Sequence, residues 1–160
     1  MKSIRIEPHE KVLLYGIGNL GRQDDGVGVR LIQKLENVKL RNHVTLEANY
    51  QLNVEDALLI SEFDVVVFID ASTRSEAVTP FSFYRLKALS ESEISSHAMK
   101  MGTVLSLCEK LYFHSPRAFV LEVPGYEWGI SEEITKQASD NLECAFQFIL
   151  GEVECTKSLS

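Results

Sequence analysis

Residues 65–70 read Val65-Val66-Val67-Phe68-Ile69-Asp70, a run of β-branched and aromatic residues that is apolar on both alternating faces. A strand with this pattern is typical of the centre of a parallel sheet, where layers of helices bury both of its faces. Asp70 ends the run, at the point where the last residue of a strand leaves the sheet. The stretch therefore predicts a central strand with a carboxylate at its carboxyl end.

Shorter strand patterns and helical patterns alternate on both sides of this run. We expect further strands at residues 12–15, 44–47 and 118–122, and helices at residues 27–35, 54–60, 103–112 and 131–150. Residues 79–86 alternate apolar and polar side chains after an early Pro80, which indicates an edge strand whose direction could be antiparallel. The predicted fold class is α/β: a three-layer α/β/α sandwich around a five-stranded, mostly parallel sheet.

The length and composition favour one domain over residues 1–160. A chain of 160 residues with 45% hydrophobic and 24% charged content is typical of a single globular core. No linker or repeat divides it. Gly151 is expected to end the last helix, which leaves residues 152–160 as a frayed tail.

Charge and cysteine content narrow the class of protein. A formal net charge of −7 would repel a polyanion, so nucleic acid is a poor partner. The first residues lack the apolar segment of a signal peptide, and no window reaches the length of a membrane span. Cys108, Cys144 and Cys155 form no closely spaced pair, which suits reduced thiols, the first two as core residues. We expect a cytoplasmic protein without a membrane partner.

A glycine-rich segment follows the first predicted strand. It reads Gly16-Ile17-Gly18-Asn19-Leu20-Gly21-Arg22-Gln23-Asp24-Asp25-Gly26-Val27-Gly28 and begins with the letters of a dinucleotide fingerprint. In a dinucleotide site, however, the helix begins within the glycine motif so that its N–H groups meet the pyrophosphate. Here two carboxylates stand in that place, and like charges about 4 Å apart repel by about 1 kcal/mol even in water. A nucleotide site is disfavoured, and we expect no organic cofactor.

Three residues are expected near the carboxyl ends of the predicted strands and could act together: one of the pair Asp24 and Asp25, Asp70, and His97. One of Asp24 and Asp25 can be explained as a helix cap, worth about 1 kcal/mol, which leaves the other available. Asp70 could also cap a turn, and His97, in the polar stretch ahead of the helix expected at residue 103, could simply be solvated. Together they offer two oxygen ligands and one nitrogen ligand, which suits a borderline divalent transition metal with further positions open.

The order of these motifs resembles a known family. The segments at residues 16–19, 24–28 and 68–71, followed by Ser96-His97 and residues 101–107, resemble the [NiFe]-hydrogenase maturation endopeptidases. The resemblance covers residues 12 to about 150. It implies a three-layer sandwich and a peptide hydrolase that removes the C-terminal extension of the hydrogenase large-subunit precursor after nickel has been inserted.

The resemblance also implies a set of site residues. It assigns Asp25, Asp70 and His97 as metal ligands. We expect these residues to engage nickel that the substrate supplies, and Asp25 or Asp70 to act as the general base of the hydrolysis. Some members carry Glu where this chain has Asp25, and a Pro is frequent where it has Leu20. Residues 50–56 are similar to the branch that serves soluble or bidirectional hydrogenases.

Two other functions remain open at this point. A noncatalytic nickel-binding maturation chaperone would use the same three ligands without cutting. A peptidyl-tRNA hydrolase-like esterase has a similar sheet, although the acidic charge disfavours it. Residues 123–129 place Tyr126 and Trp128 among turn residues, either as a packed loop or as a docking surface for the large subunit.

Overall fold

The computed structural model describes residues 4–41, 43–74, 78–87 and 96–154, and the side chains of residues 96–99 lie outside this description. The elements are β1 (Val12–Ile17), α1 (Val27–Glu36), β2 (Val44–Asn49), α2 (Asp56–Ile60), β3 (Val65–Ser72), β4 (Ser82–Leu86), α3 (Ser96–Tyr112), β5 (Arg117–Pro124) and α4 (Lys136–Glu154). In the described ranges, no helix combines the length and the apolar character that crossing a membrane requires.

The five strands form one sheet in the order β2-β1-β3-β5-β4. The strands β2, β1, β3 and β5 are parallel, and β4 pairs with β5 in the antiparallel direction. This arrangement confirms the predicted fold class, including the edge strand. That strand begins at Ser82, two residues after Pro80, which has no N–H to donate to the sheet.

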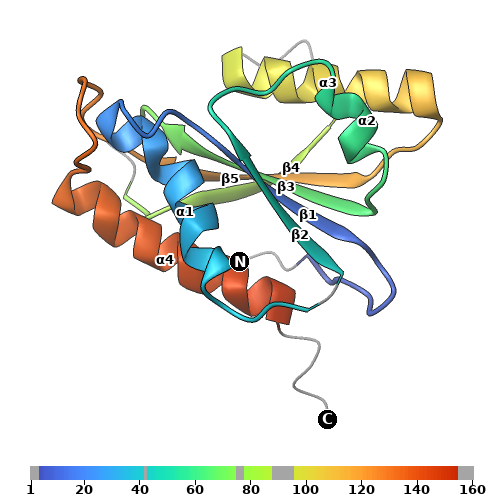
Figure 1. Ribbon diagram of the computed structural model, residues 1–160, viewed down its shortest axis with the longest axis horizontal. Coiled ribbons are helices and arrows are strands. Elements are labelled where there is room, and N and C mark those ends of the chain that lie inside the picture. The colour runs from blue at the N-terminus through green and yellow to red at the C-terminus, as the bar shows by residue number, and fades with distance from the viewer. Residues whose placement is uncertain (1–3, 42, 75–77, 88–95, 155–160) are drawn as a thin grey trace.

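Helices cover both faces of the sheet. Figure 1 shows α2 and α3 above the sheet and α1 and α4 below it. On the central strand, Val65, Val67 and Ile69 pack into the cluster that includes α1 and α4, whereas Val66 and Phe68 pack into the cluster that includes α2 and α3. Every residue of β3 is buried, as the unbroken apolar run predicts.

Three helix ends differ from the sequence prediction by four residues or more. Helix α3 begins at Ser96, ahead of the expected residue 103, so His97 lies in its first turn and not in a loop before it. Helix α4 begins at Lys136 instead of residue 131, because Thr135 Oγ1 accepts a hydrogen bond from Ala138 N (3.1 Å) and caps the helix there. The same helix continues past Gly151 to Glu154, and residues 155–160 lie outside the described residues.

The start of α1 lies directly against the sheet. A Cβ on Gly28 would stand 2.4 Å from the carbonyl oxygen of Ile69 in β3 and 2.6 Å from that of Ile17 in β1. Only glycine leaves room for this approach. The loop that precedes α1 is thereby held at the carboxyl ends of two neighbouring parallel strands.

Candidate functional site

The carboxylate of Asp25 is fixed in the loop between β1 and α1. Asp25 lies in the 3₁₀ turn Gln23–Gly26, and its Oδ2 accepts a hydrogen bond from Asn19 N (2.9 Å). The loop can fold this tightly because Gly18 has a φ of +151° and carries no Cβ, which would stand 2.0 Å from the Asp25 carbonyl oxygen. The backbone thus holds a half-buried carboxylate next to the end of β1.

Asp70 approaches the same place from β3. It is 2% exposed, and its Oδ1 accepts a hydrogen bond from Ala71 N (2.8 Å). The strand continues for two residues beyond it, so Asp70 lies inside β3 and does not end it. Because side chains alternate along a strand, Asp70 shares the face of Phe68, which packs on the side of α2 and α3.

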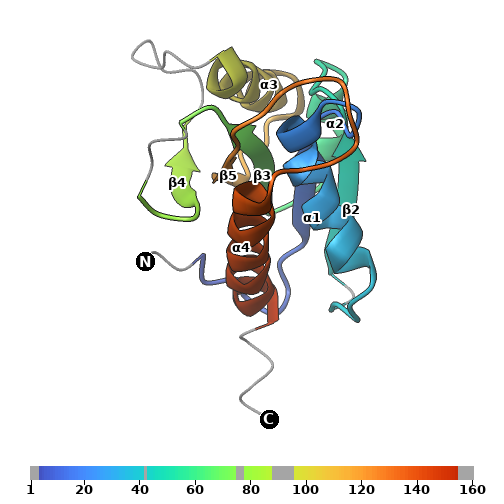
Figure 2. The same ribbon diagram turned by 90° about the vertical axis from the view of Figure 1, so that its left-hand side faces the viewer.

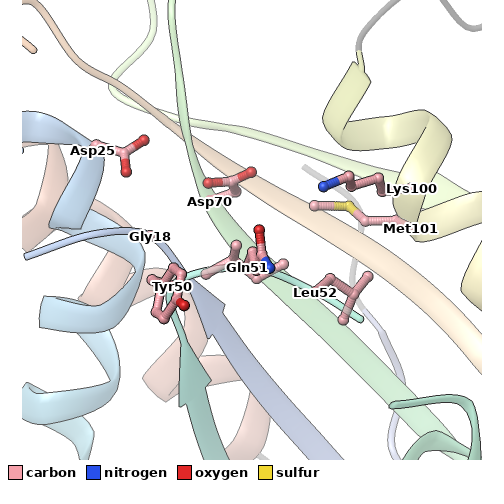
Figure 3. Close-up of a pocket in the computed structure, with 9 residues that line it drawn as sticks. Gly18, Asp25, Tyr50, Gln51, Leu52, Asp70, Lys100 and Met101 are labelled. Atoms are coloured by element: carbon pink, nitrogen blue, oxygen red, sulfur yellow. The ribbon is translucent and has the colours of Figure 1, made fainter. Parts of the chain in front are cut away.

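Both carboxylates line one cavity of about 210 Å³. Its wall consists of residues from the end of β1 and the loop after it, the segment after β2, strand β3 and helix α3: Ile17, Gly18, Asp25, Tyr50, Gln51, Leu52, Asp70, Lys100 and Met101. Figure 3 shows Asp25 and Asp70 on neighbouring elements along the upper side of this cavity. Strand β1 pairs with β2 on one side and β3 on the other, so the cavity lies where open α/β sheets usually bind ligands.

The position of His97 is described only through its backbone. Its helix turn precedes Lys100 and Met101, which line the cavity, but the side chain of His97 lies outside the described residues. Among the side chains that the structure describes, no group of three His, Cys, Asp or Glu residues is arranged to hold a metal ion. The structure therefore brings Asp25 and Asp70 to one cavity, and the predicted third ligand stays a prediction.

Asp24 has a structural role that the sequence did not reveal. It is fully buried and does not cap α1, whose N-cap is Gly26. Its carboxylate instead accepts hydrogen bonds from Tyr126 N (2.8 Å), Glu127 N (3.1 Å), Thr135 N (2.9 Å) and Thr135 Oγ1 (2.8 Å). Asp24 thereby ties the loop after β1 to the connection between β5 and α4, which Figure 2 shows passing beside the start of α1.

The two aromatic residues of this connection, Tyr126 and Trp128, are both partly buried against the core, but only Trp128 also borders a hollow. Trp128 lines a second hollow of about 330 Å³ together with Asn19, Arg22, Asp25 and Tyr50. The hydroxyl of Tyr126 accepts a hydrogen bond from Asn141 Nδ2 (3.0 Å), which ties this residue to α4. Since Asp25 and Tyr50 line both hollows, the surface next to the cavity leads toward Trp128.

Two further residues, Lys100 and Met101, line the cavity although no sequence motif includes Lys100. Lys100 and Met101 follow His97 by three and four residues, the spacing of one helix face, and that spacing was the available signal. Beneath the segment after β2, the Tyr15 hydroxyl donates a hydrogen bond to Asp56 Oδ2 (2.9 Å). Burial, and then this hydrogen bond, raise the pKa of Tyr15 far above its usual value, so the phenol stays protonated and structural.

The fold is shared with solved structures of known name. No family model matches the sequence. No curated protein matches it either. In structure the chain is similar to the hydrogenase maturating endopeptidase HybD from E. coli, with a TM-score of 0.77, 20% identity and coverage of 91% of this chain and 93% of that one.

Two further structures give the same result. The [NiFe] hydrogenase maturation protease HycI from Thermococcus kodakarensis has a TM-score of 0.75 and 20% identity, over 91% of this chain and 93% of that chain. An endopeptidase from Escherichia coli has a TM-score of 0.73 and 21% identity, with the same coverage. The chain therefore has the fold of the [NiFe]-hydrogenase maturation proteases.

Proposed function

We propose that this protein is an endopeptidase that removes the C-terminal extension of a [NiFe]-hydrogenase large-subunit precursor after nickel insertion, in the cytoplasm. The observation that carries the proposal is the cavity at the switch point of the sheet, which Asp25 and Asp70 line together. The shared fold and the order of the sequence motifs support the same reaction. The similarity at residues 50–56 favours a precursor of the soluble or bidirectional hydrogenases.

The cavity suits recognition of a metal that arrives with the substrate. Asp25 and Asp70 offer carboxylate oxygens, and His97 in the first turn of α3 would add an imidazole nitrogen. A mixed oxygen and nitrogen set of this kind fits a borderline divalent ion such as nickel. Because the nickel is carried by cysteines of the precursor, only loaded precursor would place its scissile bond correctly.

Hydrolysis of the peptide bond requires an activated water and a polarised carbonyl. Asp25 or Asp70 would accept the proton of the attacking water, since both carboxylates face the same cavity. Asp70 is almost fully buried, whereas Asp25 is half-buried and also borders the hollow that leads to Trp128. That hollow would hold the chain of the precursor next to the scissile bond, with Trp128 as an aromatic anchor.

The direct test is processing of precursor by purified protein. Nickel-loaded precursor should lose its C-terminal peptide, detected by mass spectrometry, whereas metal-free precursor should stay intact. Asp25→Asn, Asp70→Asn and His97→Ala should each slow cleavage at least about a hundredfold. Asp140→Asn serves as the control, because Asp140 is an exposed carboxylate of α4 that pairs only locally with Lys136.

Each other outcome selects a different function. Binding of loaded precursor without cleavage would favour a noncatalytic nickel-binding maturation chaperone. Release of tRNA from peptidyl-tRNA would favour an esterase related to peptidyl-tRNA hydrolase. Full activity in all three variants would show that these residues do not form the site.

A further inference from the structure

The cavity contains a cation as well as two carboxylates. Lys100 is the only basic residue among the described residues that line it, and Asp25 and Asp70 are the only acidic ones. The family motifs quoted above include His97 but not Lys100. Its ammonium group therefore places a positive charge beside the two carboxylates that are proposed to contact the metal.

The placement of Lys100 is set by its helix. Its neighbour Met101 is 2% exposed and packs into the core between the sheet and α3, so this turn of α3 is anchored. Lys100 itself is exposed at the rim. Figure 3 shows its amine end pointing across the cavity in the direction of Asp70.

A positive charge at this position has opposite effects on two forms of a metal ion. A free hydrated divalent cation is attracted by the two carboxylates and repelled by Lys100. A divalent metal ion held by three or more thiolates carries a net negative charge, so Lys100 attracts it and offsets its repulsion from the carboxylates. The same charge thus weakens the hold on the free ion and strengthens the hold on the ligated one.

We propose that Lys100 is a specificity-determining residue, which makes the cavity reject the free divalent ion and accept a metal already held by anionic ligands. This inference rests on the proposed function, in which the precursor supplies nickel on its cysteines. It adds a reason why the protein would not extract or sequester nickel from solution. In the proposed function Asp25, Asp70 and His97 contact the metal, and Lys100 sets which form of the metal they meet.

The first measurement is the affinity for free nickel, obtained by isothermal titration calorimetry of tag-free protein with nickel chloride. Across a cavity filled with water, one unit charge changes the affinity for a divalent ion by about tenfold. We expect Lys100→Gln to bind free nickel about tenfold more tightly than the wild type, and Lys100→Glu about a hundredfold more tightly.

The matched control is Lys110→Gln. Lys110 is an exposed lysine of the same helix, ten residues further on, which is about 15 Å along the helix axis. This separation exceeds the screening length at physiological salt, so the same change of charge should leave nickel affinity within twofold.

The second measurement uses nickel-loaded precursor. Lys100→Gln should raise KM several-fold with kcat within about twofold, because the lysine acts on binding and not on the chemical step. Equal nickel affinity in the wild type and both Lys100 variants, or no binding in any of them, overturns the inference and leaves the protease proposal standing. Failure of the wild type to cut loaded precursor overturns the protease proposal, and the nickel titration still decides the effect of Lys100.

Discussion

The cavity has two walls that are held in place by different forces. The hydrogen-bonded wall is the loop at residues 19–25, which carries Asp25, together with residues 125–135 behind it. The buried carboxylate of Asp24 joins these two segments, and Trp128 of the second one borders the neighbouring hollow. The apolar wall is α3 from Lys100 to Cys108. Lys100 and Met101 line the cavity, and Met101, Leu105 and Cys108 pack against the sheet. The first wall carries Asp25 and Trp128, and the second carries Lys100.

This difference separates the sensitivities of the two walls. When a buried carboxylate that accepts several hydrogen bonds is removed, each of its donors is left without an acceptor, and neighbouring groups cannot supply all of the missing bonds. Apolar packing is less directional, and its loss scales with the volume that is removed. Loss of the Asp24 carboxylate should therefore disturb the hydrogen-bonded wall, and loss of side-chain volume in α3 should disturb the apolar wall.

The largest effect is expected from Asp24→Ala. Three backbone N–H groups and the Thr135 hydroxyl lose their acceptor, and we expect a loss of about 4 kcal/mol in the free energy of unfolding. Trp128 is the only tryptophan, so its fluorescence in the folded variant should also change. Denaturant unfolding gives the first value, and Asp140→Ala should change it by less than about 0.5 kcal/mol.

Leu105→Ala should break the apolar wall with a somewhat smaller loss. Leu105 is 3% exposed in α3, and its truncation should cost about 3 kcal/mol in denaturant unfolding. The fluorescence of Trp128 should stay as in the wild type, because the hydrogen-bonded wall is intact. Leu111→Ala is the control, since Leu111 is 58% exposed on the same helix. A shift in fluorescence for Leu105→Ala equal to that of Asp24→Ala would show that the walls are coupled.

The smallest effect is a difference in thiol reactivity. Burial, and to a lesser degree the charge of Glu109, raise the pKa of Cys108, so less of this thiol is ionised at any pH below that value. In a Cys155→Ser background, iodoacetamide should modify Cys108 at least about tenfold more slowly than exposed Cys144 between pH 7 and 9. Mass spectrometry measures both rates. In the same background, Leu105→Ala should speed modification of Cys108. Equal rates for Cys108 and Cys144 without that substitution would contradict the burial of this wall.

The sequence predicted the structure best where a pattern of apolar and polar side chains is compatible with only one degree of burial. The apolar run at residues 65–70 predicted a buried central strand, and the alternation near residues 79–86 predicted the edge strand. Asp25 and Asp70 could be placed at one edge of the sheet because parallel strands end together.

Contacts between segments far apart in the sequence could not be predicted from these patterns. Asp24 and Asp25 are identical residues in one turn, yet one is enclosed by residues 126–135 and the other borders the cavity. Cys144, expected in the core, is exposed, because a helical pattern does not tell which of two adjacent faces packs. Lys100 carries no signal of its own in the sequence, since a lysine in a helix is usually solvated, and only the position of α3 brings it to the cavity.

The bonds of Asp24 also bear on synthesis of the chain. Asp24 is separated from Tyr126 and Thr135 by 102 and 111 residues, so these contacts close a long loop. Pairing of such distant segments is slow compared with local structure. During translation, β1 and its loop leave the ribosome long before Thr135 does. The nascent protein can therefore assemble most of its sheet, but the loop that carries Asp25 is not fixed in place until residues 126–135 have been made.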